Sequence, residues 1–143
     1  MLRDPRDFQI TFLSAFLCFG LYARQFSVTP AQAAVIFACG LGAQALWLRS
    51  LGLKSGFKSA AITCLSLCLL FRADNLWAPA LASLMAASSK FVLRFRGRPL
   101  FNPGNFAVVL GLLTQAAWVS PSQWGHGALL ASWMFLLGAT IVW

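Results

Sequence analysis

The sequence predicts an all-α integral membrane protein, a polytopic bundle of about six transmembrane or partly re-entrant helices. Hydrophobic residues make up 59% of the 143 residues, charged residues only 10%, and glutamate is absent. A soluble domain normally carries about 25% charged residues, and a soluble fold of this size would leave much apolar surface in water. Charged and turn-forming residues also divide the chain into successive apolar runs, a pattern typical of membrane-spanning segments.

We expect the six apolar segments to form a single membrane domain over residues 1–143. The second segment opens with Thr29-Pro30, a favourable helix start because threonine caps the helix and proline suits its first position. The last segment ends at Trp143 without a polar tail, so we expect the chain to be the N-terminal part of a longer protein. The segments are residues 8–23, 31–48, the stretch between Lys58 and Arg72, 76–89, 105–119 and 127–143.

The third segment is short for a membrane crossing. Only 13 residues separate Lys58 from Arg72, whereas a helix needs roughly 20 residues to span a bilayer core. Two alternatives remain open at this point. Snorkelling Lys and Arg side chains can extend the reach of a spanning helix, or the segment is a broken or re-entrant helix buried within the protein.

Charge distribution predicts the orientation. If all six segments cross, nine of the eleven cations lie on one side and only Arg24 and Arg72 on the other. Positively charged loops favour the cytoplasm, so we expect a multi-pass protein of the inner (cytoplasmic) membrane with a cytoplasmic N-terminus. The nine are Arg3, Arg6, Arg49, Lys54, Lys58, Lys90, Arg94, Arg96 and Arg98.

Several other functions are disfavoured by the residues themselves. The net charge of +8 sits in short clusters between apolar runs, so we attribute it to topology and expect no nucleic-acid partner. Cys64 and Cys68 share one helical face, but too few ligands accompany them for a metal site, and we expect them to pack in the core. No carboxylate lies within an apolar segment to form an ion relay; Gln44 and Gln115 are the main polar groups expected at depth.

The stretch from Ser88 to Pro103 is the most informative. Lys90, Arg94 and Arg98 mark the predicted cytoplasmic boundary, and Gly97 with Pro99 favours a turn. Asn102 then caps the fifth helix, with proline at its first position. A helix N-terminus beside cations is a ready anion or phosphate site. A capped, positive-inside loop explains the same residues and is favoured by the residues alone.

Short pieces spread through nearly the whole chain resemble one membrane family. They are Asp4-Pro5-Arg6 with Phe8-Gln9-Ile10, Lys58-Ser59 with Ile62-Thr63, Ser89-Lys90-Phe91, Arg96-Gly97-Arg98 and Phe101-Asn102-Pro103. In order and spacing the chain resembles the N-terminal half of the RnfD/NqrB family, membrane subunits of ion-translocating electron-transport complexes. The stretch Trp118 to Gly125 looks closer to the standalone UnbU-type branch, named for enediyne biosynthesis.

The resemblance implies a bundle of about ten crossings built from two inverted repeats, of which this chain would hold one half. It also implies flavin: bound riboflavin, and FMN esterified to a threonine in a Ser/Thr-Gly-Ala-Ser/Thr motif. The nearest match is Leu137-Gly138-Ala139-Thr140, which makes Thr140 the candidate anchor. This match departs from the family pattern, because Leu137 replaces the hydroxyl residue and six crossings put Thr140 toward the cytoplasmic end.

Two functional hypotheses follow. In the first, the chain is a membrane subunit or relative of a flavin-dependent electron-transport complex, with FMN or riboflavin as cofactor, other membrane subunits as partners, and enzymatic activity only within that membrane oxidoreductase. Lys90, Arg94, Arg98 and Asn102 would then contact a phosphate or a partner. In the second, the chain is a transporter or structural membrane protein that reuses the same fold without redox activity.

Overall fold

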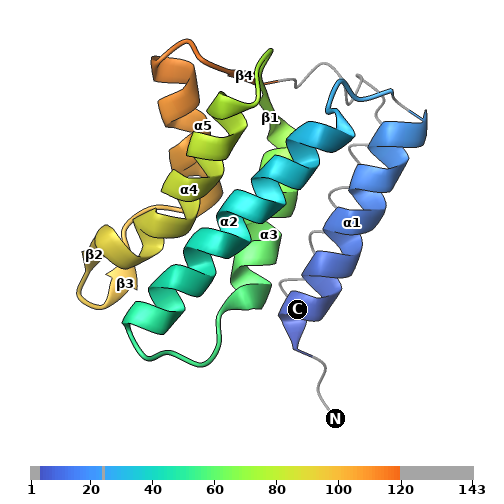
Figure 1. Ribbon diagram of the computed structural model, residues 1–143. Coiled ribbons are helices and arrows are strands. Elements are labelled where there is room, and N and C mark those ends of the chain that lie inside the picture. The colour runs from blue at the N-terminus through green and yellow to red at the C-terminus, as the bar shows by residue number, and fades with distance from the viewer. Residues whose placement is uncertain (1–3, 24, 120–143) are drawn as a thin grey trace.

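The computed structural model describes residues 4–23 and 25–119, which form a mostly helical bundle (Figure 1). Five successive helices run in alternating directions, so the connections between them lie at the two ends of the bundle. Short extended pieces complete the described part of the chain. The elements are α1 (Pro5–Ala23), α2 (Pro30–Ser50), α3 (Phe57–Leu70), β1 (Phe71–Arg72), α4 (Trp77–Val92), β2 (Arg94–Phe95), β3 (Arg98–Pro99), α5 (Pro103–Leu113) and β4 (Trp118–Val119).

The two helix starts predicted at Thr29-Pro30 and Asn102-Pro103 are confirmed. Thr29 caps α2 in a complete capping box, accepting from the Gln32 backbone N–H at 3.1 Å while the Gln32 side chain accepts from the Thr29 N–H. Asn102 caps α5, and its side chain accepts from the backbone N–H groups of Gly104 and Asn105. In both helices proline follows the cap, where its missing N–H costs no hydrogen bond.

The third apolar segment is a 14-residue helix that passes into a buried strand. Phe71 and Arg72 pair antiparallel with Val119 and Trp118, so β1 and β4 join the ends of two distant segments. The Arg72 guanidinium turns back and donates to the carbonyls of Cys68 and Phe71, at 2.8 and 2.9 Å. It therefore satisfies the last carbonyls of α3 instead of reaching away from the helix as a snorkelling side chain would.

The turn predicted at Gly97 is a tight β-hairpin. Arg94 and Phe95 pair with Pro99 and Arg98, and the two residues between the strands, Arg96 and Gly97, both have positive φ, 52° and 81°. This combination is the usual two-residue turn of a hairpin, and glycine is suited to its second position.

The core lies where α2 crosses α3 and α4, with α5 packed on α4 and α1 on α3. Cys64 and Cys68 are fully buried there, which confirms the prediction that they pack in the core. Small residues allow the helices to approach closely: a Cβ added at Gly40 of α2 would meet Cys64 Sγ of α3 at 2.6 Å. A small residue at this position therefore lets the two helix backbones pack closely.

Five of the six predicted segments contain a helix, with some changed bounds. The fifth helix ends at Leu113 instead of continuing to residue 119, because the chain turns at Gln115 (φ 54°) and becomes extended. Gln115 is therefore exposed beyond the helix end, whereas Gln44 is buried inside the bundle. The sixth segment, residues 127–143, lies outside the described residues.

Among the described helices, α2 alone is both long and apolar enough to cross a membrane by length and composition. A helix of this kind is weak evidence for a membrane span, since core helices of soluble proteins have the same properties. The two helices α3 and α5 are apolar but shorter.

Candidate functional site

One end of the bundle collects nearly all the described cations. We call it the basic end; it consists of the starts of α1, α3 and α5, the finishes of α2 and α4, and the β2–β3 hairpin (Figure 1). Nine of the eleven cations lie within the described residues, which exclude Arg3 and Arg24. Of these nine, only Arg72 lies at the opposite end. The eight at the basic end are Arg6, Arg49, Lys54, Lys58, Lys90, Arg94, Arg96 and Arg98.

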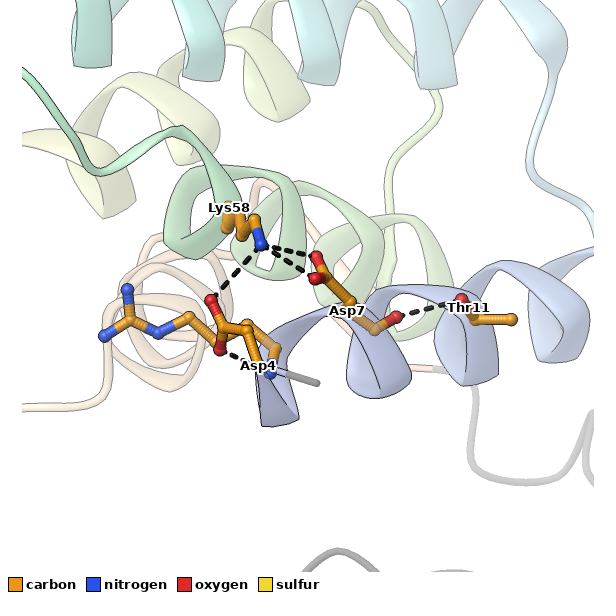
Figure 2. Close-up of polar contacts among 5 residues, drawn as sticks. Asp4, Asp7, Thr11 and Lys58 are labelled. Atoms are coloured by element: carbon orange, nitrogen blue, oxygen red, sulfur yellow. Dashed lines mark hydrogen bonds and ion pairs between the residues drawn. The ribbon is translucent and has the colours of Figure 1, made fainter. Parts of the chain in front are cut away.

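Both acidic residues at the basic end are bound by the same lysine. Lys58 Nζ at the start of α3 lies 3.2 Å from Asp4 Oδ2 and 2.7 Å from Asp7 Oδ1 (Figure 2). The pKa of Asp4 is lowered, first by the backbone N–H of Arg6 that its carboxylate accepts and then by Lys58. The side chains remain partly exposed, so the arrangement aligns α1 with α3 more than it stabilises the fold.

A pocket of about 210 Å³, which we call the Lys90 pocket, opens between the basic-end segments. Lys90 and Gln44 are among its lining residues, but Lys90 Nζ and Gln44 Oε1 are themselves buried and have no hydrogen-bond partner among the described residues. Gln44 is only 1% exposed, and a buried polar atom without a partner is rare and costly. The pocket is lined by Arg6, Gln44, Leu48, Leu53, Ser55, Gly56, Ser59, Lys90, Phe91, Arg94 and Pro99.

Aromatic contacts between α2 and α4 fix the position of Lys90. Trp47 Nε1 of α2 donates to Ser88 Oγ of α4 at 3.0 Å. The Trp47 ring also stacks on Phe91, with centroids 5.5 Å apart and planes inclined by 12°. Lys90 Nζ lies 5.6 Å from the centroid of the Phe91 ring, a cation–π contact. The backbone that carries Lys90 is thus held against α2 on either side of it.

A second pocket of about 270 Å³, the Asn102 pocket, adjoins the first through Arg6 and Ser59, which line both. Its α3 wall is a stripe of hydroxyls. Thr63 and Ser66 donate their protons to carbonyls one turn earlier in their own helix, which leaves their oxygen lone pairs as acceptors. The lining consists of Arg6, Gln9, Ser59, Ile62, Thr63, Ser66, Asn102 and Pro103.

The structure brings together some of the predicted site residues and separates others. Lys90 and Arg94 line the Lys90 pocket, and Asn102 lines the pocket beside it. Arg98 lies instead in an open hollow formed by the hairpin alone, together with Arg96. Thr140, the candidate flavin anchor, lies outside the described residues.

Sequence reasoning missed two members of the site. Arg6 was assigned only to topology, although it lines both pockets. Gln44 was expected only as a polar group at depth, yet it lines the Lys90 pocket, and its Oε1 has no hydrogen-bond partner among the described residues. The signal that pointed toward Arg6 was Asp4-Pro5-Arg6, one of the pieces on which the family resemblance rests.

No group of metal-ligating side chains occurs within residues 4–23 and 25–119. Comparison of the chain with protein-family models, with curated proteins and with solved structures finds no match. The site must therefore be interpreted from its own geometry and from the resemblance carried by its residues.

Proposed function

We propose that the chain is a membrane subunit or relative of a flavin-dependent, ion-translocating electron-transport complex of the RnfD/NqrB kind. One observation carries the proposal. The pieces that resemble this family are far apart in the sequence, yet Arg6, Ser59, Lys90 and Asn102 from four of them line two adjoining pockets. Segments that resemble the family would be expected to meet at one site if they bind the same ligand.

The outer surface of the helices supports a membrane location. Large apolar side chains on the middle turns of α4 and α5 remain exposed, and exposed apolar patches of this kind mark contact with lipid or another protein. They include Leu81, Leu84, Met85, Val109 and Leu112.

The lengths of α2 and of α3 with β1 are compatible with this location. By rise per residue, the 21-residue α2 is about 31 Å long, close to a hydrocarbon core of about 30 Å. The 14-residue α3 measures about 21 Å, and β1 extends it by about 7 Å. A helix broken near its end is tolerated in a membrane where its backbone is buried in protein, and both β1 residues are buried.

The separation of eight described cations from Arg72 supports a cytoplasmic basic end in the inner membrane. The N-terminus would then also be cytoplasmic, because α1 starts at that end. Arg72 is a weak exception, since its charge is buried against α3 carbonyls and the ring of Phe26.

The described residues fit only part of a flavin nucleotide. The Lys90 and Asn102 pockets measure about 210 and 270 Å³, below the range of about 300–1,000 Å³ for sites that enclose drug-sized ligands. Their cations suit a phosphate, whereas an enclosed flavin ring would need walls beyond these residues. FMN or riboflavin as cofactor therefore rests on the resemblance.

The test is the optical spectrum of the purified full-length gene product. The proposal expects flavin absorbance and fluorescence, with release of noncovalent flavin on denaturation. Protein that is folded and free of flavin would contradict it. Arg6→Met should weaken any flavin retention, whereas Lys54→Met, at an exposed loop position of the same end, should leave it unchanged.

The second candidate function is a transporter that uses this fold without redox activity. The hydroxyl stripe of the Asn102 pocket favours it, because acceptor oxygens along a broken helix are a common lining of a substrate path. Substrate flux into liposomes without an electron donor would support this function. Strict dependence of flux on a reduced donor would support the first.

A further inference from the structure

The β2–β3 hairpin has two faces with different surroundings (Figure 1). Side chains alternate between the two faces of a strand, and directly paired residues of neighbouring strands share a face. Arg94 and Pro99 are paired, and both line the Lys90 pocket with residues of α1, α2 and α3. Phe95 and Arg98 are paired on the other face, which Leu100 shares because it lies two residues after Arg98. We call this second face the exposed face.

The exposed face combines cations with large apolar side chains. Phe95 is 63% exposed and Leu100 is 56% exposed. Arg96, at the turn, holds its guanidinium 5.4 Å from the centroid of the Phe95 ring. Arginines beside exposed aromatic and leucine side chains are the composition of segments that lie in a membrane–water interface. The shallow hollow on this face is lined by Phe95, Arg96, Arg98, Pro99 and Leu100.

No acidic side chain of this protein neutralises the arginines of the exposed face. The sequence has only three acidic residues. Asp4 and Asp7 are both bound by Lys58, and Asp74 lies at the opposite end of the bundle. Negative charge that complements the exposed face must therefore come from another molecule. Anionic lipids supply such charge, and the arginine fork matches the oxygens of their phosphates.

The apolar side of α4 favours a lipid surface over an acidic protein as the source of this charge. Leu81, Met85 and Val92 are all exposed, and their spacing of four and seven residues places them on one side of the helix. The next exposed apolar side chain, Phe95, follows three residues later on the hairpin. In the membrane location proposed above, α4 would leave the hydrocarbon where the hairpin begins, which puts the arginines at the level of headgroup phosphates. An acidic protein would match the charge but would not account for the apolar side chains.

We propose that the exposed face of the hairpin binds the surface of a membrane that contains anionic lipid. Arg96 and Arg98 donate to lipid phosphates, and Phe95 and Leu100 enter the boundary between headgroups and acyl chains. The hairpin thereby gathers anionic lipid around the end of α4. This inference rests on the membrane location proposed above and not on redox activity, so a flavin-free protein would leave it intact.

The experiment places a fluorescent reporter on the exposed face of the full chain. Phe95→Trp is reconstituted in nanodiscs that mix phosphatidylcholine with phosphatidylglycerol, and the wild type, with its native tryptophans, gives the background. Bromine on the acyl chains of one lipid at a time quenches tryptophan on contact, so the two arms report which lipid lies beside the hairpin. We expect both lipids to quench, and brominated phosphatidylglycerol to quench about three times as much per molecule or more.

The opposite result has a distinct signature. A reporter that neither brominated lipid quenches, but that aqueous iodide does quench, lies in water, as docking of an acidic soluble protein would require. That result in a reconstituted protein overturns this inference alone. Protein that stays dissolved without detergent or lipid would overturn the membrane location, and this inference with it.

Charge variants of the reporter protein assign the lipid preference to the hairpin. Arg96→Gln with Arg98→Gln should abolish the preference for phosphatidylglycerol, while quenching by brominated phosphatidylcholine persists and shows that the hairpin is still in place. Arg49→Gln with Lys54→Gln removes the same charge from exposed positions of the basic end, so the preference should stay within about twofold. A preference that survives in the hairpin pair, or that both pairs lose equally, overturns the proposal.

The apolar part of the exposed face is tested separately. Leu100→Gln in the reporter protein should raise quenching by iodide about twofold or more, because it removes an apolar side chain that enters the membrane boundary. Leu51→Gln is the matched control, since Leu51 is similarly exposed, at 50%, but lies outside the hairpin. Iodide quenching that Leu100→Gln leaves unchanged, or that both variants raise equally, would contradict the immersion of the exposed face.

Discussion

Lys58 makes the longest-range polar contact of the basic end, because it joins residues more than fifty positions apart in the sequence. Its two carboxylate partners, Asp4 and Asp7, come from α1 and the residue before it (Figure 2). The lysine therefore adds a polar contact between α1 and α3 to the apolar packing of Leu13 and Leu17 against the core.

The ion pairs of Lys58 should weaken in acid and stay unchanged near neutral pH. The pKa of folded Asp4 lies below its ordinary value of 3.8. Its stabilising contribution is therefore complete above that ordinary value and is lost as pH falls through the lowered pKa. Spin labels at Phe8→Cys and Phe57→Cys should keep a narrow distance distribution from about pH 7 to pH 5 and broaden only below about pH 4.

Asp4→Asn provides the control for the pH experiment. It removes the titrating carboxylate, so the distribution should already be broader at neutral pH and should change less on acidification. Broadening of the unmodified pair near pH 6 would point to a different titrating group.

The cap of α2 makes a second prediction for a single residue. Thr29→Ala should lower the free energy of unfolding by about 0.5–2 kcal/mol, because it removes the side-chain half of the capping box. Thr11→Ala is the matched control, since Thr11 is exposed within α1 and bonds only to the Asp7 carbonyl of its own helix. Unfolding in mixed detergent micelles measures both, and equal losses would mean that the cap contributes nothing.

Single residues also show what the sequence could and could not predict. Thr29 and Asn102 were predicted as caps because a capping side chain acts on the backbone two or three residues away. Snorkelling was one of two alternatives for the Arg72 side chain, yet this side chain is 2% exposed, because its partners include carbonyls freed where α3 ends. That end depends on pairing with β4, almost fifty residues further along the chain.

At the scale of elements, the approach of α2 to α3 depends on one glycine. Gly40→Ala should destabilise the protein by about 1–3 kcal/mol, since the new Cβ would meet the buried Cys64 Sγ at 2.6 Å. Gly42→Ala, in the same helix and with nothing within 4 Å of the added Cβ, should be neutral or stabilising by up to about 1 kcal/mol.

A double variant identifies the contact responsible. Gly40→Ala combined with Cys64→Ala removes the sulfur that the new methyl group meets, so the pair should lose less stability than the two single losses added together. Strict additivity would show that Gly40→Ala acts through something other than Cys64.

The elements were predicted well where apolar runs are bounded by charges or caps. The helix α5 was predicted too long because residues 114–119 contain no charge, glycine or proline to mark its end, and hydropathy cannot distinguish an uncharged extended segment from a helix. Site residues that are close in the sequence were likewise predicted together: Lys90 is near the end of α4 and Arg94 begins β2, four positions later. Arg6 joins them only through the packing of α1 on α3.

At the scale of the whole molecule, the segregation of charge predicts orientation. Lys54 lies at the basic end and Asp74 at the opposite end, and both are exposed. A membrane-impermeant thiol reagent should modify Asp74→Cys in intact cells and Lys54→Cys only after permeabilisation. The wild type, with its native cysteines, sets the background. Labelling of Lys54→Cys in intact cells would reverse the proposed topology.

The antiparallel pairing of β1 with β4 has a mechanical consequence. The two strands share a ladder of only two residue pairs, and they are the place where segments almost fifty residues apart meet. This pairing should therefore open before the helices packed beside it do. Backbone amides of Phe71 and Val119 should exchange with deuterium sooner than those of the central turns of α2. The bundle would then loosen first at the junction of these two distant segments while its helices stay packed.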